Sequence, residues 1–211
     1  YFADRILKCD GAIQITGSHN PPDYNGFKMV LGHHSFFGDD ITELGVRAVA
    51  GLNKVSGGSF EDQSVFDGYV ERLTKHADFG DLSIVWDAGN GAAGPATEAM
   101  LATLSRQAKL SGNHKALYCD IDGHFPNHHP NPVDPETLES LRHHVKTLNA
   151  DLGIWFDGDG DRIGLVDAKG RQIAGDILTA FLATDILTRS PGADILFDIK
   201  SSALAMQIVR D

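Results

Sequence analysis

The chain has few cysteines, few basic residues and no long apolar run, and each shortage excludes a class of protein. Its two cysteines, Cys9 and Cys119, form no Cys-x-x-Cys motif, so we expect reduced thiols in apolar surroundings. No apolar stretch approaches the roughly 20 residues that cross a bilayer, and the first residues do not resemble a signal peptide. We therefore expect a cytoplasmic protein with no membrane partner.

Basic residues are outnumbered, 18 against 29 acidic ones, which gives a net charge of −11. Nucleic-acid binding needs clustered lysine and arginine to contact phosphates, and the sequence lacks such clusters. Nucleic acid is therefore not expected as a partner, and an anionic ligand would depend on local cations. The apolar fraction of 42% is sufficient for the cores of one large or two small domains.

Three carboxylates are crowded into the segment 157–162, which reads Asp-Gly-Asp-Gly-Asp-Arg and directly follows the apolar run 152–156. Such close charges repel one another by roughly 1 kcal/mol per pair even in water, so a cation should hold them together. Mg²⁺ prefers oxygen ligands, and glycine lets the loop bend without steric cost. We predict a magnesium site with Asp157, Asp159 and Asp161 as ligands.

The polar residues also allow interpretations other than a magnesium site. The three acids can simply solvate a turn, since Asp-Gly steps favour turns. A calcium EF-hand loop does not fit, because Arg162 and Ala168 stand where Gly and Glu are required. Zinc bound by His124, His128 and His129 is disfavoured against a structural or surface loop, because no Cys or Glu completes a tetrahedral set.

A serine lies in a turn directly after a short apolar strand that ends near Thr16. Ser18 is followed by His19, and Lys28 lies just past the turn, so an anionic group on Ser18 would find donors nearby. A Ser-His pair alone is usually an ordinary loop, and no Gly-x-Ser-x-Gly elbow surrounds it. The residues themselves therefore leave the role of Ser18 open.

Two motifs in the same order resemble those of the α-D-phosphohexomutase family. Residues 16–28, Thr-Gly-Ser-His-Asn-Pro-Pro-Asp-Tyr-Asn-Gly-Phe-Lys, resemble the family's phosphoserine loop, and residues 157–162 resemble its magnesium loop. Segments 122–132 and 197–202 are similar to family segments between and after these loops. The resemblance covers the whole chain and is greatest to the bacterial phosphomannomutase/phosphoglucomutase branch.

The resemblance implies a reaction and a set of ligands. Ser18 would carry a phosphoryl group, and Mg²⁺ would be held by the three aspartates together with one phosphate oxygen on Ser18. A hexose 1-phosphate, of mannose or glucose, would become a hexose 1,6-bisphosphate and then a hexose 6-phosphate. Phosphoryl transfer depends mainly on alignment and charge neutralisation, which a metal ion and cationic side chains supply.

The resemblance also implies roles for other side chains. Lys28 and Arg162 would contact the transferring phosphate, while His19 and Asn20 would shape the loop and contact the phosphoserine. Lys28 is our first choice as general acid or base, because a lysine crowded by other cations has a lowered pKa. Lys200 would contact substrate, or lies in a turn exposed to solvent.

Two other classes of function remain as alternatives. Residues 89–94 read Gly-Asn-Gly-Ala-Ala-Gly between a strand and a helix, with Asp120 or Asp122 near the position of a ribose-binding acid, which is typical of an NAD-dependent oxidoreductase. The same glycine pattern also serves tight packing of a strand against a helix. In the resembled family this turn is associated with domain architecture, so we assign it no cofactor. The third class is a non-catalytic, metal-binding module.

Strands alternate with helices, which predicts an α/β fold of consecutive domains with mostly parallel, mixed sheets. We expect the end of a first domain at 1–64 with the serine loop, a second domain at 65–173 with the metal loop, and the start of a third at 174–211. The expected strands are 12–16, 26–31, 82–87, 115–120, 151–156 and 194–198, with a hairpin at 169–170. The expected helices are 2–8, 39–51, 65–76, 95–108, 135–148, 175–189 and 202–210.

Compared with the resembled family, the chain begins inside the first domain and ends before the sugar-selecting Gly-Glu-x-Ser-Gly loop and the last domain. The sequence therefore does not predict a preference between glucose and mannose. We expect these residues alone to bind Mg²⁺ weakly and not to turn over substrate, because reversal of a bisphosphate needs the missing parts. The complete protein is expected to be a monomer.

Overall fold

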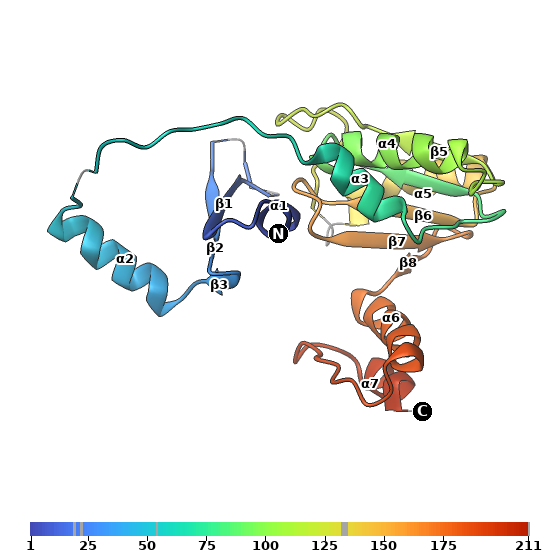
Figure 1. Cartoon of the computed structure of the whole chain (residues 1–211). Coiled ribbons are helices and arrows are strands. Elements are labelled where there is room, and N and C mark those ends of the chain that lie inside the picture. The colour runs from blue at the N-terminus through green and yellow to red at the C-terminus, as the bar shows by residue number, and fades with distance from the viewer. Residues whose placement is uncertain (19, 22, 54, 132–134, 211) are drawn as a thin grey trace.

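The computed structural model describes every residue except 19, 22, 54, 132–134 and 211 (Figure 1). Helices and strands alternate along the chain, which confirms the predicted α/β class. The elements are α1 (Phe2–Leu7), β1 (Gly11–Thr16), β2 (Gly26–Leu31), β3 (His34–Phe36), α2 (Asp39–Ala50), α3 (Phe66–Thr74), β4 (Ile84–Asp87), α4 (Ala93–Arg106), β5 (His114–Leu117), the 3₁₀ helix η1 (Pro135–Leu138), α5 (Glu139–Thr147), β6 (Leu152–Phe156), β7 (Ile163–Asp167), β8 (Gln172–Ile173), α6 (Gly175–Arg189) and α7 (Ala203–Arg210).

The first sheet is antiparallel and contains β1, β2 and β3 in that order. Gly11 pairs with Leu31 and Thr16 with Gly26, so the serine loop is the connection between two adjacent strands. A parallel pair needs a crossover of a dozen or more residues, and this connection is shorter, which is why the expectation of mostly parallel pairing is wrong here. Strand β3 was not predicted.

The second sheet has five strands in the order β5-β4-β6-β7-β8. Strands β5, β4 and β6 are parallel, while β7 and β8 are added as antiparallel hairpin strands. Parallel pairing of β4 with β6 brings Asp87 opposite Trp155, so both strands end at the same edge of the sheet. That edge is where open α/β sheets bind ligands, and both the turn 88–92 and the aspartate loop 157–162 begin there.

The core lies between this second sheet and the helices η1 and α5. Leu138, Leu141, Val145 and Trp155 are fully buried in one cluster. Burial of one such side chain contributes roughly 1.5–3 kcal/mol relative to leaving it exposed. The strand that carries the aspartate loop is therefore fixed by its own packing.

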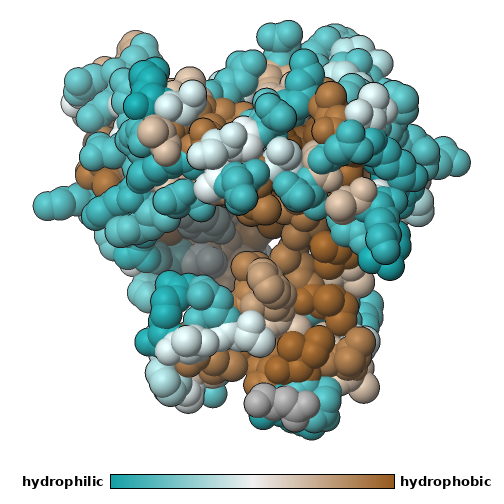
Figure 2. Space-filling view, turned by 90° about the vertical axis from the view of Figure 1, so that its right-hand side faces the viewer, coloured by the Kyte–Doolittle hydropathy of each residue, from teal (hydrophilic) through white to brown (hydrophobic). Residues whose placement is uncertain are grey.

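The end of the chain forms a smaller unit in which α6 and α7 pack together. The strand predicted at 194–198 is wrong, because these residues form no strand and pair with none of the described strands. In Figure 2 the lower half of the molecule, which holds α6 and α7, carries a broad apolar surface. Its exposed apolar side chains include Phe181, Leu182, Leu196, Ile199 and Leu204. The predicted domain boundaries at residues 64 and 173 stay a prediction.

Both cysteines are partly buried free thiols. Burial raises the pKa of Cys119 to about 11, and the nearby carboxylates of Glu98, Asp120 and Asp87 add to the shift. In the part of the chain that is described, no helix has both the length and the apolar character required to cross a membrane.

Candidate functional site

Two loops that lie 139 residues apart in sequence meet at the candidate site. Ser18, two residues after the end of β1, donates a hydrogen bond from its hydroxyl to Asp157 Oδ2 at 3.2 Å. Asp157 is the first residue after β6 and is fully buried. Ser18 has φ 51°, a left-handed conformation that non-glycine residues adopt rarely. The serine hydroxyl and a buried carboxylate are thus brought into direct contact.

Arg162 connects the two ends of the aspartate loop and also reaches the serine. Its backbone N–H donates to Asp157 Oδ1 at 3.0 Å, and its Nε donates to Asp157 Oδ2 at 2.9 Å. Its Nη2 lies 2.7 Å from the same oxygen and donates to Ser18 Oγ at 3.2 Å. A planar guanidinium can make these contacts together, and it places positive charge beside the serine hydroxyl.

Thr16 and Lys28 contact the second carboxylate from the first sheet. Thr16 Oγ1 donates to Asp159 Oδ2 at 2.9 Å and accepts the backbone N–H of Ser18, also at 2.9 Å. Lys28 Nζ lies 2.8 Å from Asp159 Oδ2 and also donates to Asp161. Thr16 belongs to the serine motif but was not predicted as a site residue. Its position two residues before Ser18, where its hydroxyl can accept a local N–H, is the signal for this role.

The expectation that Lys28 has a lowered pKa is wrong. Hydrogen bonds to Asp159 and Asp161, together with their charges, raise the pKa of Lys28 well above its usual value despite partial burial. Burial by itself raises the pKa of Asp159, but the hydrogen bonds from Lys28 and Thr16 outweigh it and lower that pKa. The neighbours of Lys28 are carboxylates rather than cations, so Lys28 is a protonated donor here.

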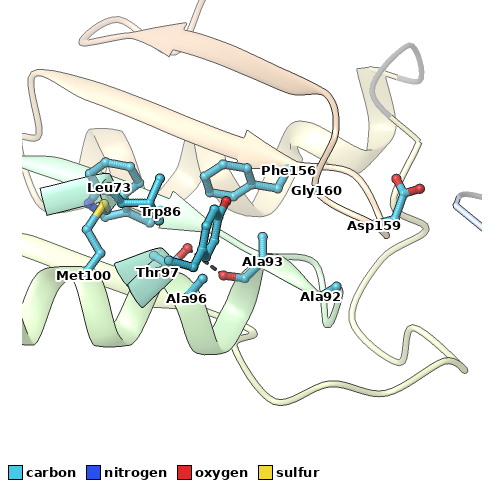
Figure 3. Close-up of a pocket in the computed structure, with 11 residues that line it drawn as sticks. Leu73, Trp86, Ala92, Ala93, Ala96, Thr97, Met100, Phe156, Asp159 and Gly160 are labelled. Atoms are coloured by element: carbon cyan, nitrogen blue, oxygen red, sulfur yellow. Dashed lines mark hydrogen bonds between the residues drawn. The ribbon is translucent and has the colours of Figure 1, made fainter. Parts of the chain in front are cut away.

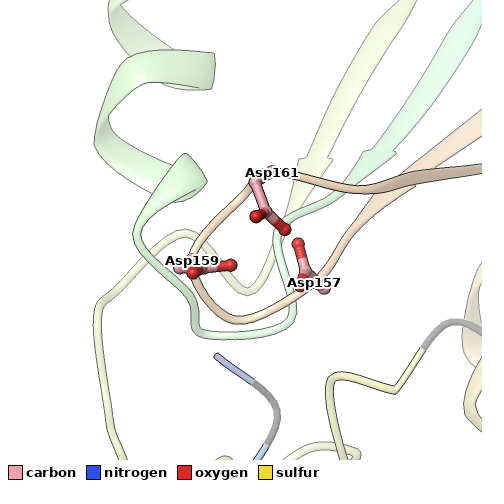
Figure 4. Close-up of side chains that lie close together, drawn as sticks. All are labelled: Asp157, Asp159 and Asp161. Carbon is pink, nitrogen blue, oxygen red and sulfur yellow. The ribbon is translucent and has the colours of Figure 1, made fainter. Parts of the chain in front are cut away.

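The three aspartates converge toward one another on the loop, as Figure 4 shows. Asp157, Asp159 and Asp161 each offer a carboxylate oxygen, and these oxygens lie within 4.8 Å of one another. Among the described residues, Asp159 Oδ1 is buried and accepts no hydrogen bond, so it has a free ligand position. Oxygen atoms are the donor type that hard divalent cations require. The cluster can therefore hold a metal ion.

The glycine-rich turn at 89–94 supports the aspartate loop instead of presenting donors to a dinucleotide. The backbone N–H of Asn90 donates to Tyr118 O at 2.8 Å, and that of Ala92 donates to Gly158 O at 2.9 Å. In a dinucleotide site such groups point at the pyrophosphate. A Cβ on Gly94 would lie 2.0 Å from Cys119 O, which shows that this glycine serves packing. The oxidoreductase alternative therefore has no structural support.

A cleft of about 250 Å³ lies beside the serine. One wall is formed by the serine loop, including Asn20 and Tyr24, and the other by the turn at Asn90 and the loop at Phe125. The predicted substrate-binding residue Asn20 is exposed and lines this cleft. Small polar ligands next to Ser18 would enter from here.

A second cleft of about 330 Å³ lies between α3, α4 and the second sheet (Figure 3). Leu73, Trp86, Met100 and Phe156 give it a mainly apolar lining. Asp159 is also part of the lining, but in Figure 3 its carboxylate lies apart from the apolar side chains. This cleft is less suited to a phosphorylated ligand than the one beside the serine.

The predicted histidine loop contains one histidine whose side chain is largely buried. His128 Nε2 lies 3.0 Å from both carboxylate oxygens of Asp87, and its side chain is only 9% exposed. Asp87 Oδ1 also accepts the backbone N–H of Gly89. His124, in contrast, has an 88% exposed side chain. Among the described residues, the cluster that could hold a metal ion is formed by the aspartates, and the role of the histidine loop stays a prediction.

The remaining predicted residues lie outside this network or outside the described residues. His19 is not among the described residues, so its predicted contact with the serine phosphate stays a prediction. The side chain of Lys200 is 86% exposed, and its ion pair within the described part of the chain is with Asp198 at 3.9 Å. This geometry agrees with the alternative of a solvent-exposed turn.

Comparison with known proteins finds matches for the two parts of the chain that carry the serine loop and the aspartate loop. A sequence model described as phosphoglucomutase/phosphomannomutase, alpha/beta/alpha domain I, matches residues 1–49. A second, described as alpha/beta/alpha domain II of the same family, matches residues 67–170. These matches include both the serine loop and the aspartate loop.

Individual relatives agree with these matches. A Pseudomonas aeruginosa protein named phosphomannomutase/phosphoglucomutase is 38% identical over 99% of this chain and 44% of that protein. A phosphoglucomutase from Neisseria meningitidis serogroup B is 39% identical over 100% of this chain and 45% of its own length. The crystal structure of a phosphoglucomutase/phosphomannomutase family protein from Burkholderia thailandensis superimposes with a TM-score of 0.86 at 42% identity, covering 95% of this chain and 43% of that chain. The chain thus spans less than half the length of these relatives.

Proposed function

Because the chain belongs to the phosphoglucomutase/phosphomannomutase family, we propose that the complete protein interconverts hexose 1-phosphates and hexose 6-phosphates. The sugar is mannose or glucose, and a hexose 1,6-bisphosphate is the intermediate. The contact of Ser18 Oγ with Asp157 and Arg162 carries this proposal, because it places a serine hydroxyl between a cation and a buried carboxylate. Nothing comparable supports hydride transfer.

In the proposed reaction, phosphorylated Ser18 donates its phosphoryl group to the free 6-hydroxyl of a hexose 1-phosphate. A bond from O6 to phosphorus forms while the bond from Ser18 Oγ to phosphorus breaks. The proton of the 6-hydroxyl leaves, and Ser18 Oγ recovers one. The bisphosphate then turns around and returns its 1-phosphoryl group to Ser18, which leaves a hexose 6-phosphate.

The cationic side chains around Ser18 are suited to stabilise the transferring group. Arg162 Nη2 already donates to Ser18 Oγ, so it would contact oxygens of a phosphoryl group attached there. Lys28, held protonated by Asp159 and Asp161, would supply a second donor from the first sheet. Fixed positive charge aimed at developing negative charge is the main source of catalysis in phosphoryl transfer.

We propose Mg²⁺ as the metal at the aspartate loop. Asp157, Asp159 and Asp161 would hold it, with one oxygen of the phosphorylated Ser18 completing the protein ligands. Mg²⁺ favours carboxylate ligands combined with a phosphate oxygen, and it supplies charge that offsets the phosphoryl oxygens. The free ligand position on Asp159 Oδ1 supports this choice.

Labelling of Ser18 tests the proposal directly. The complete protein is incubated with Mg²⁺ and glucose 1,6-bisphosphate carrying labelled phosphate, and the labelled peptide is identified by mass spectrometry. We expect label on Ser18 and none after Ser18→Ala, whereas Ser59→Ala, in an exposed segment between α2 and α3, keeps the label. A coupled assay with mannose 1-phosphate and glucose 1-phosphate then determines the sugar. Absence of label from a folded, Mg²⁺-binding protein would leave the non-catalytic module as the better explanation.

The proposal extends to the setting of the enzyme. We propose a monomeric phosphoprotein of the cytoplasm, because hexose phosphates are charged metabolites retained inside cells. The net charge of −11 agrees with a protein that does not bind nucleic acid. Sedimentation of the complete protein, before and after phosphorylation, measures the oligomeric state.

A further inference from the structure

Gly158, between the first two metal-binding aspartates, lies against the backbone of the serine loop. A Cβ added to Gly158 would be 2.2 Å from the carbonyl oxygen of Ser18 and 3.4 Å from Phe125 Cζ. Real Cβ atoms essentially never approach another atom closer than 3.0 Å. The φ of Gly158 is not in the left-handed region, so close approach, and not backbone conformation, explains the glycine.

The peptide of Gly158 also contacts the glycine-rich turn. Its carbonyl oxygen accepts the N–H of Ala92 at 2.9 Å, and a Cβ on Gly91 would lie 2.7 Å from that oxygen. The supporting turn is anchored through Asn90, whose side-chain amide donates to Asp120 O at 2.9 Å. Gly158 therefore contacts both the turn 88–92 and the carbonyl of Ser18.

We propose that Gly158 is a positioning residue that sets the distance between the Ser18 hydroxyl and the metal-binding carboxylates. The turn 88–92 supports Gly158, and the contact of Gly158 with the Ser18 carbonyl then determines where the serine loop lies. This inference rests on the proposed function, because the distance matters when Ser18 accepts and donates a phosphoryl group. The proposal also explains the glycine-rich turn, which would support the site and would not bind a cofactor.

The size of the clash predicts the size of the effect. A methyl group at Gly158 must move the Ser18 carbonyl from 2.2 Å to at least 3.0 Å, a shift of about 0.8 Å. The Ser18 hydroxyl makes its contacts with Asp157 and Arg162 at 3.2 Å, so this shift breaks or weakens both. A misplacement of about 1 Å near reacting atoms lowers a rate by roughly 100-fold.

The test compares Gly158→Ala with Gly45→Ala in the complete protein. Gly45 lies in α2, where an added Cβ meets no atom within 4 Å, so it controls for the substitution itself. We expect Gly158→Ala to lower the rate of Ser18 phosphorylation by roughly 100-fold. Its affinity for Mg²⁺, measured by calorimetry without sugar phosphate, should change less than about threefold, because the three aspartates remain. Gly45→Ala should match the unaltered protein in both.

Hydrogen exchange of residues 16–25 gives a readout that does not depend on phosphoryl transfer. Gly158→Ala should speed exchange in this loop and leave β6 and β7 unchanged. Gly91→Ala, whose added Cβ would lie 2.7 Å from the carbonyl oxygen of Gly158, should act in the same direction. Unaltered loop exchange or unaltered labelling in Gly158→Ala would overturn the proposal. If the second sheet fails to fold in both Gly158→Ala and Gly91→Ala, the proposal is also overturned, because the close contacts of Gly158 would then serve folding. If the unaltered protein is never labelled, the proposed function fails, and loop exchange still decides the positioning role.

Discussion

The serine loop belongs to the first sheet and the aspartate loop to the second, and these two parts of the molecule are packed very differently. The aspartate loop follows β6, whose Trp155 is fully buried in a core with Leu138 and Leu141. The serine loop connects two strands of a small antiparallel sheet, and the neighbouring helix α2 buries none of its residues. The carboxylates are thus fixed by a core of their own, whereas the position of the serine depends on contacts made across the boundary.

Among the described residues, the contacts across this boundary are mostly polar, beside the ring contact of Phe2 with Tyr69. Ile13, Ile15 and Phe27 on the first sheet are each more than 60% exposed, so apolar burial contributes little to holding this sheet in place. Hydrogen bonds from Thr16 and Lys28 to Asp159 contribute instead. Each such bond adds only about 0.5–3 kcal/mol, so small changes at the boundary should move the serine without unfolding the second sheet.

The largest expected effect is on stability, and it compares a core residue of the second sheet with a residue of α2. Leu141→Ala removes a fully buried side chain and should lower the free energy of unfolding of the second sheet by roughly 2–5 kcal/mol. Leu44→Ala on α2, where the side chain is 41% exposed, should change it by less than about 0.5 kcal/mol. Urea unfolding followed by tryptophan fluorescence measures this, because Trp86 and Trp155, the two tryptophans, lie in β4 and β6. If Leu141→Ala and Leu44→Ala lower the free energy of unfolding equally, the two parts of the molecule do not differ in packing as described.

A second prediction concerns the contact across the boundary. Arg162→Lys keeps the charge but cannot reproduce the bonds of the guanidinium to both Asp157 and Ser18, so Ser18 labelling should fall on the order of 100-fold. Arg171→Lys is the matched control, because Arg171 makes an exposed ion pair with Asp167 and should keep at least half of the labelling rate. Tryptophan-monitored unfolding should stay similar in both. If Arg162→Lys is labelled at a rate close to that of the control, Arg162 does not contribute to the phosphorylation of Ser18.

The smallest expected effect concerns the buried pair that anchors the turn beneath the aspartate loop. Burial disfavours protonated His128, but the hydrogen bond and charge of Asp87 outweigh it and raise the pKa of His128. The resulting stabilisation is fully present below the unfolded pKa of about 6.5 and is lost as the pH rises through the folded pKa. His128→Gln should therefore destabilise the second sheet by roughly 1–3 kcal/mol at about pH 6, and by less at about pH 9.

An exposed histidine on the same loop provides the control for this pH dependence. His124→Gln removes a largely solvated side chain, so its effect on urea unfolding should be within about 0.5 kcal/mol at either pH. A loss of stability in His128→Gln that is larger at high pH than at low pH would contradict the proposed charge state of the buried pair.

Local patterns were sufficient to predict several parts of the fold. Strand 26–31 agrees with β2, and the apolar run before Asp157 forms β6. Alternating apolar residues and turn residues determine such elements locally, so no distant partner was needed. The meeting of Ser18 with the aspartate loop was expected from the resemblance of two motifs, and the residues alone left it open.

Features that depend on distant partners were missed. Residues 194–198 have the composition of a strand, but the described chain offers no strand for them to pair with. The sequence did not show which histidine of the loop is buried, because Asp87, its partner, lies 41 residues away. Lys28 was expected among cations, yet folding places it on Asp159 and Asp161, and such long-range charges determine pKa values.

The raised pKa of Cys119 has a practical consequence. A thiol with a pKa of about 11 is almost wholly protonated at neutral pH, and the thiolate is the form that reacts with alkylating reagents. A maleimide dye should therefore react slowly with Cys119, and of these two cysteines Cys9, which lies between α1 and β1, is the expected attachment site. Energy transfer from Trp86 and Trp155 to a dye on Cys9 would report movement of the serine-bearing sheet relative to the aspartate loop.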